Sequence, residues 1–233
     1  MPNFSYSRIL DLSHPISQGM PLWPGDPPTE FVTAATLERD GYLLRRFSLG
    51  EHSGTHLNAP AAFHADGATV DAYPLEALLV QAAVLDVRRL AVANADYVLT
   101  VADILAWEER HGRLAAGSLV LLCAGWSARW PEPAFLNADA GGQLHFPAFG
   151  LEAARFLLEE RAVAGLGTDT PGLDPPWDET FSINRLVLEK PRLALECLAN
   201  LSELPPVGAM LIIGLLRLRG GSGSPASVLA LAP

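Results

Sequence analysis

The sequence predicts a mixed α/β fold. Apolar runs of roughly four to eight residues, bounded by Gly, Pro or polar residues, outnumber the segments with helical periodicity. Strands and helices do not alternate regularly along the chain, and no Gly-x-Gly-x-x-Gly loop is present, so a doubly wound nucleotide-binding sheet is disfavoured. With 233 residues, 49% hydrophobic and 18% charged, residues 1–233 are expected to form a single domain around one sizeable core.

Each expected element follows from a local pattern. The best helix signal begins at Thr100, because Asp103 lies three residues further on, as in a capping box, and the helix should run to His111. A second helix is expected over 149–161 from its apolar face, and a shorter third over 182–189. Strands are expected at 8–12, 31–36, 43–49, 82–87, 119–124, 163–167, 193–197 and 210–216.

The composition limits the kinds of partner that the protein is expected to bind. The 26 acidic residues against 16 basic ones give a net charge of -10, without a basic cluster, which argues against nucleic acid. The longest apolar run, 207–218, is shorter than the about 20 residues that cross a bilayer, and the first residues lack a signal-peptide pattern. Cys123 and Cys197 lie in apolar runs and are expected to be buried thiols. We therefore expect a cytoplasmic protein whose partner is a small molecule.

The densest chemical segment is 51–67. It holds His52, His56 and His64, half of the six histidines of the chain. Two imidazoles four residues apart, followed by the side-chain oxygen of Asn58, can close on one transition-metal ion. A His-x-x-x-His spacing is a weak signal by itself, so ordinary loop histidines remain an alternative.

Two further loops contain candidate site residues. Trp23 lies in the Pro-rich segment 20–28, where it either fills an edge of the core or forms the wall of a ligand pocket. The loop 167–178 follows an expected strand and carries three carboxylates, and such loops often carry functional sites. Asp169 and Asp174 stand in good turn sequences, which favours structural roles for both.

Several segments in the same order resemble the cyclase family of metal-dependent hydrolases, which includes bacterial kynurenine formamidase and isatin hydrolase. The family pattern His-x-Gly-Thr-His-x-Asp-x-Pro-x-His is similar to the segment from His52 onward. The other similar segments are Asp11-Leu-Ser-His-Pro-Ile16, Met20-Pro-Leu-Trp-Pro-Gly-Asp26, Leu121-Leu-Cys-Ala-Gly-Trp126, Phe146-Pro147, Gly167-Thr-Asp-Thr-Pro-Gly-Leu-Asp174 and Leu195-Glu-Cys-Leu-Ala-Asn-Leu201. The resemblance covers nearly the whole chain and implies the swivelling β/β/α type of fold and a homodimer or homotetramer.

The resemblance also implies a metal site, which this chain changes. His52 and His56 match the two histidine ligands of the family's first metal, and Glu196 matches a glutamate that holds a second metal. Three family positions are altered: Asn58 replaces the bridging Asp, Ala62 the proton-shuttling His, and Asn184 the second-metal His.

These substitutions limit the metal chemistry. A neutral amide at position 58 lacks the charge that allows two dications to lie a few ångströms apart, so a two-metal centre is not expected. One divalent ion, Zn or Mn, could still bind to His52, His56, the Asn58 oxygen and Glu196, and the absence of any metal is the close alternative. Asn58 and Asn184, with Trp23, are also candidate substrate contacts.

The candidate acid–base residues are His56, His64 and Glu196. His64 lies two residues beyond Ala62, and in an extended segment the two side chains would share a face. Glu196 follows an apolar run, where a carboxylate must be paired, bound to a metal or raised in pKa. A raised pKa would suit a general acid.

The sequence therefore favours a hydrolase of a small amide, cyclic amide or lactone with at most one metal ion. A metal-independent cyclase, dehydratase or lyase that uses the same His and Glu residues is the alternative. A catalytically silent protein that only binds a small molecule is the third possibility, because a fold alone does not decide among them.

Overall fold

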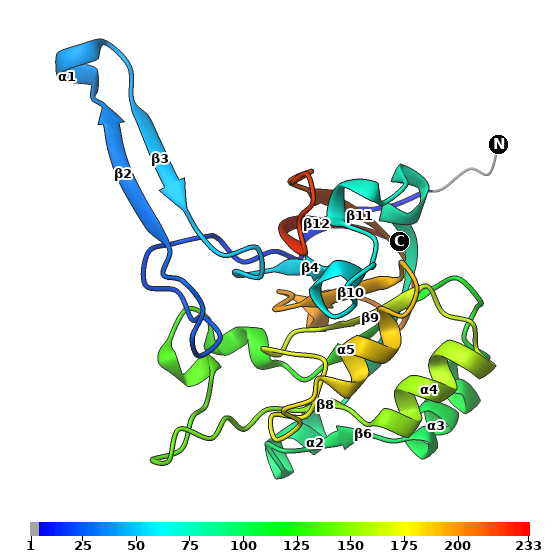
Figure 1. Ribbon diagram of the computed structural model, residues 1–233. Coiled ribbons are helices and arrows are strands. Elements are labelled where there is room, and N and C mark those ends of the chain that lie inside the picture. The colour runs from blue at the N-terminus through cyan, green and yellow to red at the C-terminus, as the bar shows by residue number, and fades with distance from the viewer. Residues whose placement is uncertain (1–4) are drawn as a thin grey trace.

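A large mixed sheet organises the molecule, which is described by a computed structural model over residues 5–233 (Figure 1). The strand order is β1-β12-β11-β5-β7-β9-β10-β4, and β12 also pairs with β4, which closes the sheet into a barrel-like arrangement. The pairs β5–β7, β7–β9 and β9–β10 are parallel, and the other pairs are antiparallel. The strands are β1 (Arg8–Asp11), β4 (His56–Asn58), β5 (Leu79–Asp86), β7 (Leu119–Cys123), β9 (Gly165–Thr168), β10 (Leu193–Glu196), β11 (Val207–Leu215) and β12 (Gly223–Ala232). The predicted mixed α/β class is confirmed.

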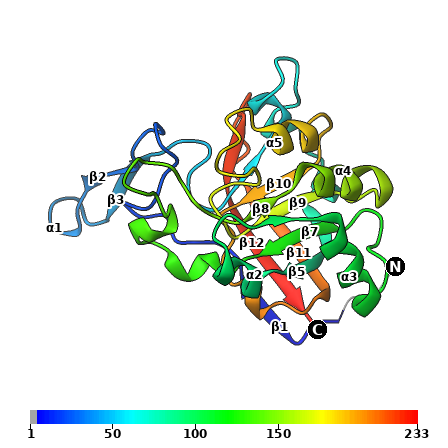
Figure 2. The same cartoon turned by 90° about the horizontal axis from the view of Figure 1, so that it is seen from below.

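The longer helices lie together beside the sheet, as Figure 2 shows for α3, α4 and α5. In α3 the Thr100 side chain accepts from the Asp103 backbone N–H, while the Asp103 carboxylate accepts from the Thr100 N–H, which confirms the predicted capping box. The expected second and third helices are also present, with slightly shorter bounds. The helices of this group are α2 (Arg88–Ala93), α3 (Val101–His111), α4 (Leu151–Glu160) and α5 (Ser182–Val187), beside the short strands β6 (Val98–Leu99) and β8 (Ala148–Phe149).

Apolar side chains fill both faces of the sheet. One cluster joins the sheet to α3, α4 and α5, with Phe149 and Ile104 fully buried. A second cluster lies on the other face, around Leu57, Leu121 and Leu211. Cys123 and Cys197 are free and buried, as predicted. Within the described part of the chain, no helix has both the length and the apolar content needed to cross a membrane.

A two-stranded arm stands away from the barrel (Figure 1). It consists of β2 (Glu30–Ala35) and β3 (Leu44–Ser48), with the short helix α1 (Leu37–Asp40) at its tip. Both strands were expected from sequence, but they form a sheet of their own instead of joining the large one.

Two strands of the closed sheet were not expected from sequence. β12 contains Gly223 and Pro225, and Pro within a run normally argues against a strand. Pro225 is tolerated because β4, its partner on that side, is only three residues long. β4 itself lies within the segment 51–67, which was interpreted as a loop.

Asp169 has the structural role that its turn sequence predicts. Its carboxylate accepts hydrogen bonds from the buried backbone N–H groups of Ala124 and Trp126, at 2.8 and 3.0 Å. Burial raises the pKa of Asp169 to about 6 despite these bonds. The residue therefore joins the end of β9 to the end of β7.

We expect Asp169→Ala to lower the free energy of unfolding by about 2–6 kcal/mol, because it leaves two buried donors without a partner at about 1–3 kcal/mol each. Urea denaturation measures the loss. Asp139→Ala is the matched control, because Asp139 also accepts from two backbone N–H groups but is exposed, so water can replace it. Equal losses in the two variants would contradict this role for Asp169.

Candidate active site

Strand pairing brings together candidate residues that are far apart in the sequence. In the antiparallel pair β10–β4, Glu196 lies opposite His56 and Ala194 lies opposite Asn58. On the other side of β4, Gly223 of β12 lies opposite Asn58. The site therefore forms where β4 closes the sheet.

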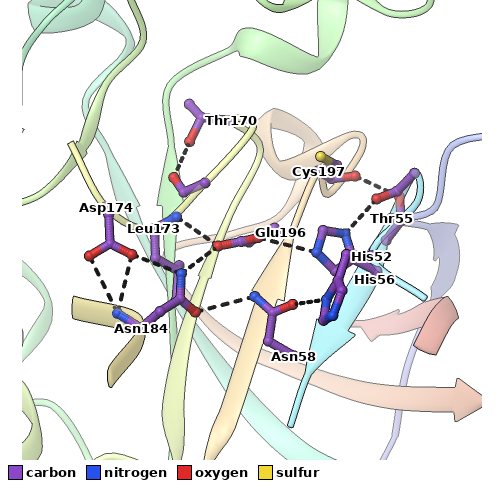
Figure 3. A network of polar contacts seen from close by, with 12 residues as sticks. His52, Thr55, His56, Asn58, Thr170, Leu173, Asp174, Asn184, Glu196 and Cys197 are labelled. Carbon is purple, nitrogen blue, oxygen red and sulfur yellow. Dashed lines mark hydrogen bonds and ion pairs between the residues drawn. The ribbon is translucent and has the colours of Figure 1, made fainter. Parts of the chain in front are cut away.

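His56 and Glu196 form a buried pair. His56 Nε2 lies 3.2 Å from Glu196 Oε2 (Figure 3). His56 Nδ1 donates to the Gly54 carbonyl oxygen at 2.8 Å. Burial opposes charge on both groups, but their mutual attraction prevails: it raises the pKa of His56 and lowers the pKa of Glu196 to about 2. Of the three states expected for Glu196, the structure shows the paired one, and the suggestion of a raised pKa is wrong.

An amide network extends from this pair (Figure 3). The Asn184 amide group donates to Asp174 at 2.8 Å and to Glu196 Oε1 at 2.9 Å. The Asn58 amide group donates to the Asn184 oxygen at 3.2 Å. Asp174 also accepts from the backbone N–H groups of Ile183 and Asn184, so it fixes the start of α5 as well as the Asn184 side chain. Every polar atom of the two asparagine side chains thus has a partner within the protein.

His52 lies at the end of this network. Its Nδ1 is 2.6 Å from Asn58 Oδ1, and its Nε2 is 3.0 Å from Ser222 Oγ. Burial, together with the positive charge of His56, lowers the pKa of His52. Gly223 is required here, because a Cβ at that position would lie 2.5 Å from the His52 ring.

These groups line one cavity of about 290 Å³, near the small end of ligand pockets. Its walls are largely apolar. Trp23 lies in the wall and packs against Phe146 and Phe181, so it is both a packing residue and part of the pocket. The aromatic and acidic lining residues are Trp23, Phe63, Phe135, Phe181, Asp26, Asp174, Asp178 and Glu196.

The predicted metal ligands do not fit a divalent ion in this arrangement. No group of three or more His, Cys, Asp or Glu side chains within residues 5–233 is placed to hold one. His52 Nδ1 faces the Asn58 oxygen, and His56 Nε2 faces Glu196, so the atoms that would ligate an ion bond to each other instead. The Asn184 N–H₂ group donates to both buried carboxylates, Asp174 and Glu196, in the place of the contacts that a cation would otherwise supply.

The structure does not place His64 in the cavity. Residues 60–62 form a 3₁₀ turn and not an extended segment, so the expectation that His64 shares a face with Ala62 is wrong. Ala62 lines the cavity, whereas His64 Nε2 lies 3.1 Å from the Arg185 carbonyl oxygen beside a separate hollow. His52, His56, Asn58, Asn184, Glu196 and Trp23 are brought together, and His64 is not.

Sequence reasoning missed Ser222 and Asp26 as lining residues of the cavity. Ser222 lies in a Gly-rich turn before β12, and only the pairing of β12 with β4 brings it to His52. Asp26 belongs to a Pro-Gly turn that carries no catalytic spacing, and it reaches the cavity because Trp23 does. Neither residue has a signal in the sequence that distinguishes it from an ordinary turn residue.

A closed mixed sheet that holds an ionised His–Glu pair in an apolar cavity defines an enzyme-like small-molecule site. A family model named Cyclase matches residues 10–175, and the chain belongs to this cyclase family. The resemblance seen in the sequence is thereby confirmed.

Individual relatives agree with the family assignment. The chain is 37% identical to an isatin hydrolase of Roseibium aggregatum, with 97% of this chain and 89% of that protein covered. The solved structure of isatin hydrolase A from Ralstonia solanacearum is similar with a TM-score of 0.91 at 35% identity, covering 97% and 92% of the two chains. A structure described as a potential metal-dependent hydrolase with cyclase activity shares the fold, with a TM-score of 0.71 at 24% identity and 96% of each chain covered.

Proposed function

We propose that this protein is a hydrolase that opens a small cyclic amide carrying an aromatic or apolar ring. The buried His56–Glu196 pair in the wall of an aromatic cavity carries the proposal. The similarity to isatin hydrolases supports hydrolysis of an amide bond and a cyclic substrate of about this size. Isatin, or a molecule of like shape, is therefore the substrate class that we favour.

The residues that line the cavity have different roles in the proposed reaction. His56 is held as a cation by Glu196 and Gly54, so it places positive charge where negative charge develops on the carbonyl oxygen of the substrate. His52 has a lowered pKa and presents Nε2 at the cavity wall, where it accepts a proton from the attacking group. Trp23 and Phe181 bind the flat ring by aromatic contact.

A bound ion would add Lewis-acid polarisation of the carbonyl. The side-chain atoms that could bind an ion are directed at each other, so the proton transfer and the charge stabilisation of the proposed reaction use only the side chains. At most one ion per chain remains our expectation, and Zn and Mn are the ions to test.

The test is an assay of the purified protein with isatin, formanilide and a small lactone, each before and after treatment with a chelator. Ring opening of isatin that survives chelation supports the proposal. Cyclisation or elimination without hydrolysis would instead identify the alternative cyclase, dehydratase or lyase. Saturable binding without turnover of any substrate would identify a silent binding protein, and both results would overturn the hydrolase.

His64→Ala should leave kcat and KM within about twofold of the unaltered enzyme, because the imidazole lies outside the cavity. Steady-state kinetics on the best substrate of the panel check this. His111→Ala, at the exposed end of α3, is the control for loss of a surface imidazole. A selective fall in kcat for His64→Ala would restore His64 as the replacement for the missing proton shuttle.

A further inference from the structure

We propose that Asp26 recognises the ring N–H of the cyclic amide, so that this site selects lactams with a free N–H over N-substituted lactams and over lactones. The inference rests on the proposed function and narrows the substrate class of the same cavity. Four carboxylates line that cavity, those of Asp26, Asp174, Asp178 and Glu196. They differ in whether the protein itself already supplies their hydrogen-bond donors.

Two of the four carboxylates belong to the buried polar network. Glu196 accepts from the Leu173 backbone N–H and from the Asn184 amide group, at 2.9 Å each, and it pairs with His56. Asp174 accepts from the same amide group at 2.8 Å and from two backbone N–H groups at the start of α5. Both carboxylates are therefore bound by donors of the protein.

The third carboxylate, that of Asp178, holds the turn before α5. Its Oδ1 accepts from the backbone N–H and the hydroxyl of Thr180, and its Oδ2 accepts from the same two groups of Ser182. Burial disfavours the charge of Asp178, but these four hydrogen bonds prevail and lower its pKa to about 2. Each oxygen has two acceptor sites, so the protein fills all four.

The Asp26 carboxylate is the exception among the four. It is half-buried in the cavity wall, and no N–H or O–H group within residues 5–233 lies at hydrogen-bond distance from it. A carboxylate that has lost part of its water without gaining a protein donor is favoured to accept from a ligand. Asp26 is therefore the open acceptor that the cavity offers to its substrate.

A tight turn ties Asp26 to the wall that binds the ring. The Asp26 backbone N–H donates to the Trp23 carbonyl oxygen at 3.0 Å, which closes a turn over residues 23–26. Pro24 at the second position and Gly25 at the third, with a φ of 96°, are typical of a type II turn. The Cα atoms at the two ends of such a turn lie within about 7 Å of each other. A ring that packs against Trp23 therefore has its edge within reach of Asp26.

The edge of a lactam matches the charges on this side of the cavity. In a small ring the amide N–H and the carbonyl oxygen are neighbours and point the same way. The charge of Asp26 acts on both His52 and His56, so the carboxylate and the His56 cation face one region of the cavity. Asp26 can thus bind the N–H while the positive charge of His56 attracts the adjacent oxygen.

Two close relatives of a lactam lack this donor. A lactone presents a ring oxygen to the Asp26 carboxylate, and an N-methyl lactam presents a methyl group. Either molecule would remove water from the carboxylate without replacing the lost hydrogen bond. A site that is built to bind an N–H rejects such analogues, because its own polar group is then left unpaired.

Asp26 acts on binding and not on the step that breaks the bond. The hydrogen bond from the N–H is already present in the bound substrate, and it does not make the carbonyl carbon easier to attack. Its removal should therefore raise KM and leave kcat nearly unchanged, as expected for an interaction that the ground state and the transition state share. Asp26 is thus a specificity residue.

The experiment compares the steady-state kinetics of isatin and N-methylisatin on the unaltered protein, Asp26→Asn and Asp26→Ala. The unaltered protein should favour isatin at least about tenfold in kcat/KM. Asp26→Ala should raise KM for isatin about 10- to 100-fold, the range for a hydrogen bond to a charged group, and should change kcat and the KM for N-methylisatin less than about threefold. Asp26→Asn preserves the shape of the side chain, so purely steric exclusion of the methyl group would persist in that variant.

The matched controls are Asp66→Asn and Asp66→Ala. Asp66 is exposed and lines the separate hollow beside His64, so these variants remove one negative charge without changing the cavity. They should retain the full preference for isatin. An equal loss of preference in the Asp66 variants would assign the effect to net charge and overturn the role of Asp26.

Calorimetry with oxindole and N-methyloxindole gives a second readout that does not depend on turnover. Oxindole has the same lactam edge but lacks the second carbonyl that activates isatin, so it serves as a ligand. The unaltered protein should bind oxindole at least about tenfold more tightly than N-methyloxindole. This difference should disappear in Asp26→Ala.

The outcomes separate this inference from the proposed function. A preference for isatin that is the same in the unaltered protein and in both Asp26 variants would overturn the recognition and leave the hydrolase intact. An Asp26-dependent preference for oxindole, without opening of any cyclic amide, would keep the recognition and overturn the hydrolase. If the variants fail to fold, the unaltered protein still decides: equal affinity for oxindole and N-methyloxindole overturns the inference, and a preference for the free N–H supports it.

Discussion

The double variant Asn58→Asp with Asn184→His should bind a divalent ion at least about 100-fold more tightly than the unaltered protein. The first change supplies an anionic oxygen beside His52. The second supplies an imidazole and removes the amide group that now occupies Glu196 Oε1. Elemental analysis after loading with Zn or Mn and desalting, with calorimetry for the affinity, measures the change.

The unaltered protein should retain at most one equivalent under the same conditions. Asn94→Asp adds the same charge at an exposed position and should leave the metal content unchanged. Two tightly bound equivalents in the unaltered chain would refute the loss of the binuclear centre. A double variant that folds yet gains no metal would show that the geometry around β4 no longer permits the family site.

His56→Ala and Glu196→Gln should each lower kcat by about 10²- to 10⁴-fold with little change in KM, because their charges act on the transition state. Glu196→Gln removes the anion that keeps His56 protonated. His56→Ala removes the cation itself. Steady-state kinetics on the substrate identified by the assay measure both effects.

Both substitutions can also destabilise the fold, and this effect must be separated from the loss of catalysis. Removing His56 alone leaves Glu196 as an unpaired buried charge, which costs about 3–5 kcal/mol, so kinetics are measured below the unfolding transition of each variant. His111→Ala and Glu109→Gln, both exposed on α3, serve as matched controls. Turnover by His56→Ala within tenfold of the unaltered enzyme would show that the buried pair only stabilises the fold.

The strands and helices that the sequence predicted are those with strong local signals. A few neighbouring residues are enough to predict each of these elements. Examples are the capping box of α3, the apolar face of α4 and the apolar runs of β5, β7 and β10. β12 was missed because its Gly223, Pro225 and alanines have low strand propensity. Its pairing with three other strands overrides that propensity.

The site was predicted in part. The likeness to the family along the chain identified His52, His56, Asn58, Asn184 and Glu196, which the structure brings into one cavity. It could not give the direction of each side chain. His64 was misplaced because a 3₁₀ turn was taken for an extended segment, and Ser222 was missed because it is adjacent to His52 only in space.

The sequence by itself determined the fold class, the family and the substitution of three family site residues, because these depend on residue identity and on local order along the chain. Only the tertiary structure decided which contacts the residues of the altered site make. Cross-strand register places His56 opposite Glu196, and the resulting ion pair lowers the Glu196 pKa where burial alone would raise it. Donor and acceptor matching among Asn184, Asn58 and His52 then directs His52 toward Ser222, which no spacing in the sequence reveals, because that choice depends on contacts between segments from opposite ends of the chain.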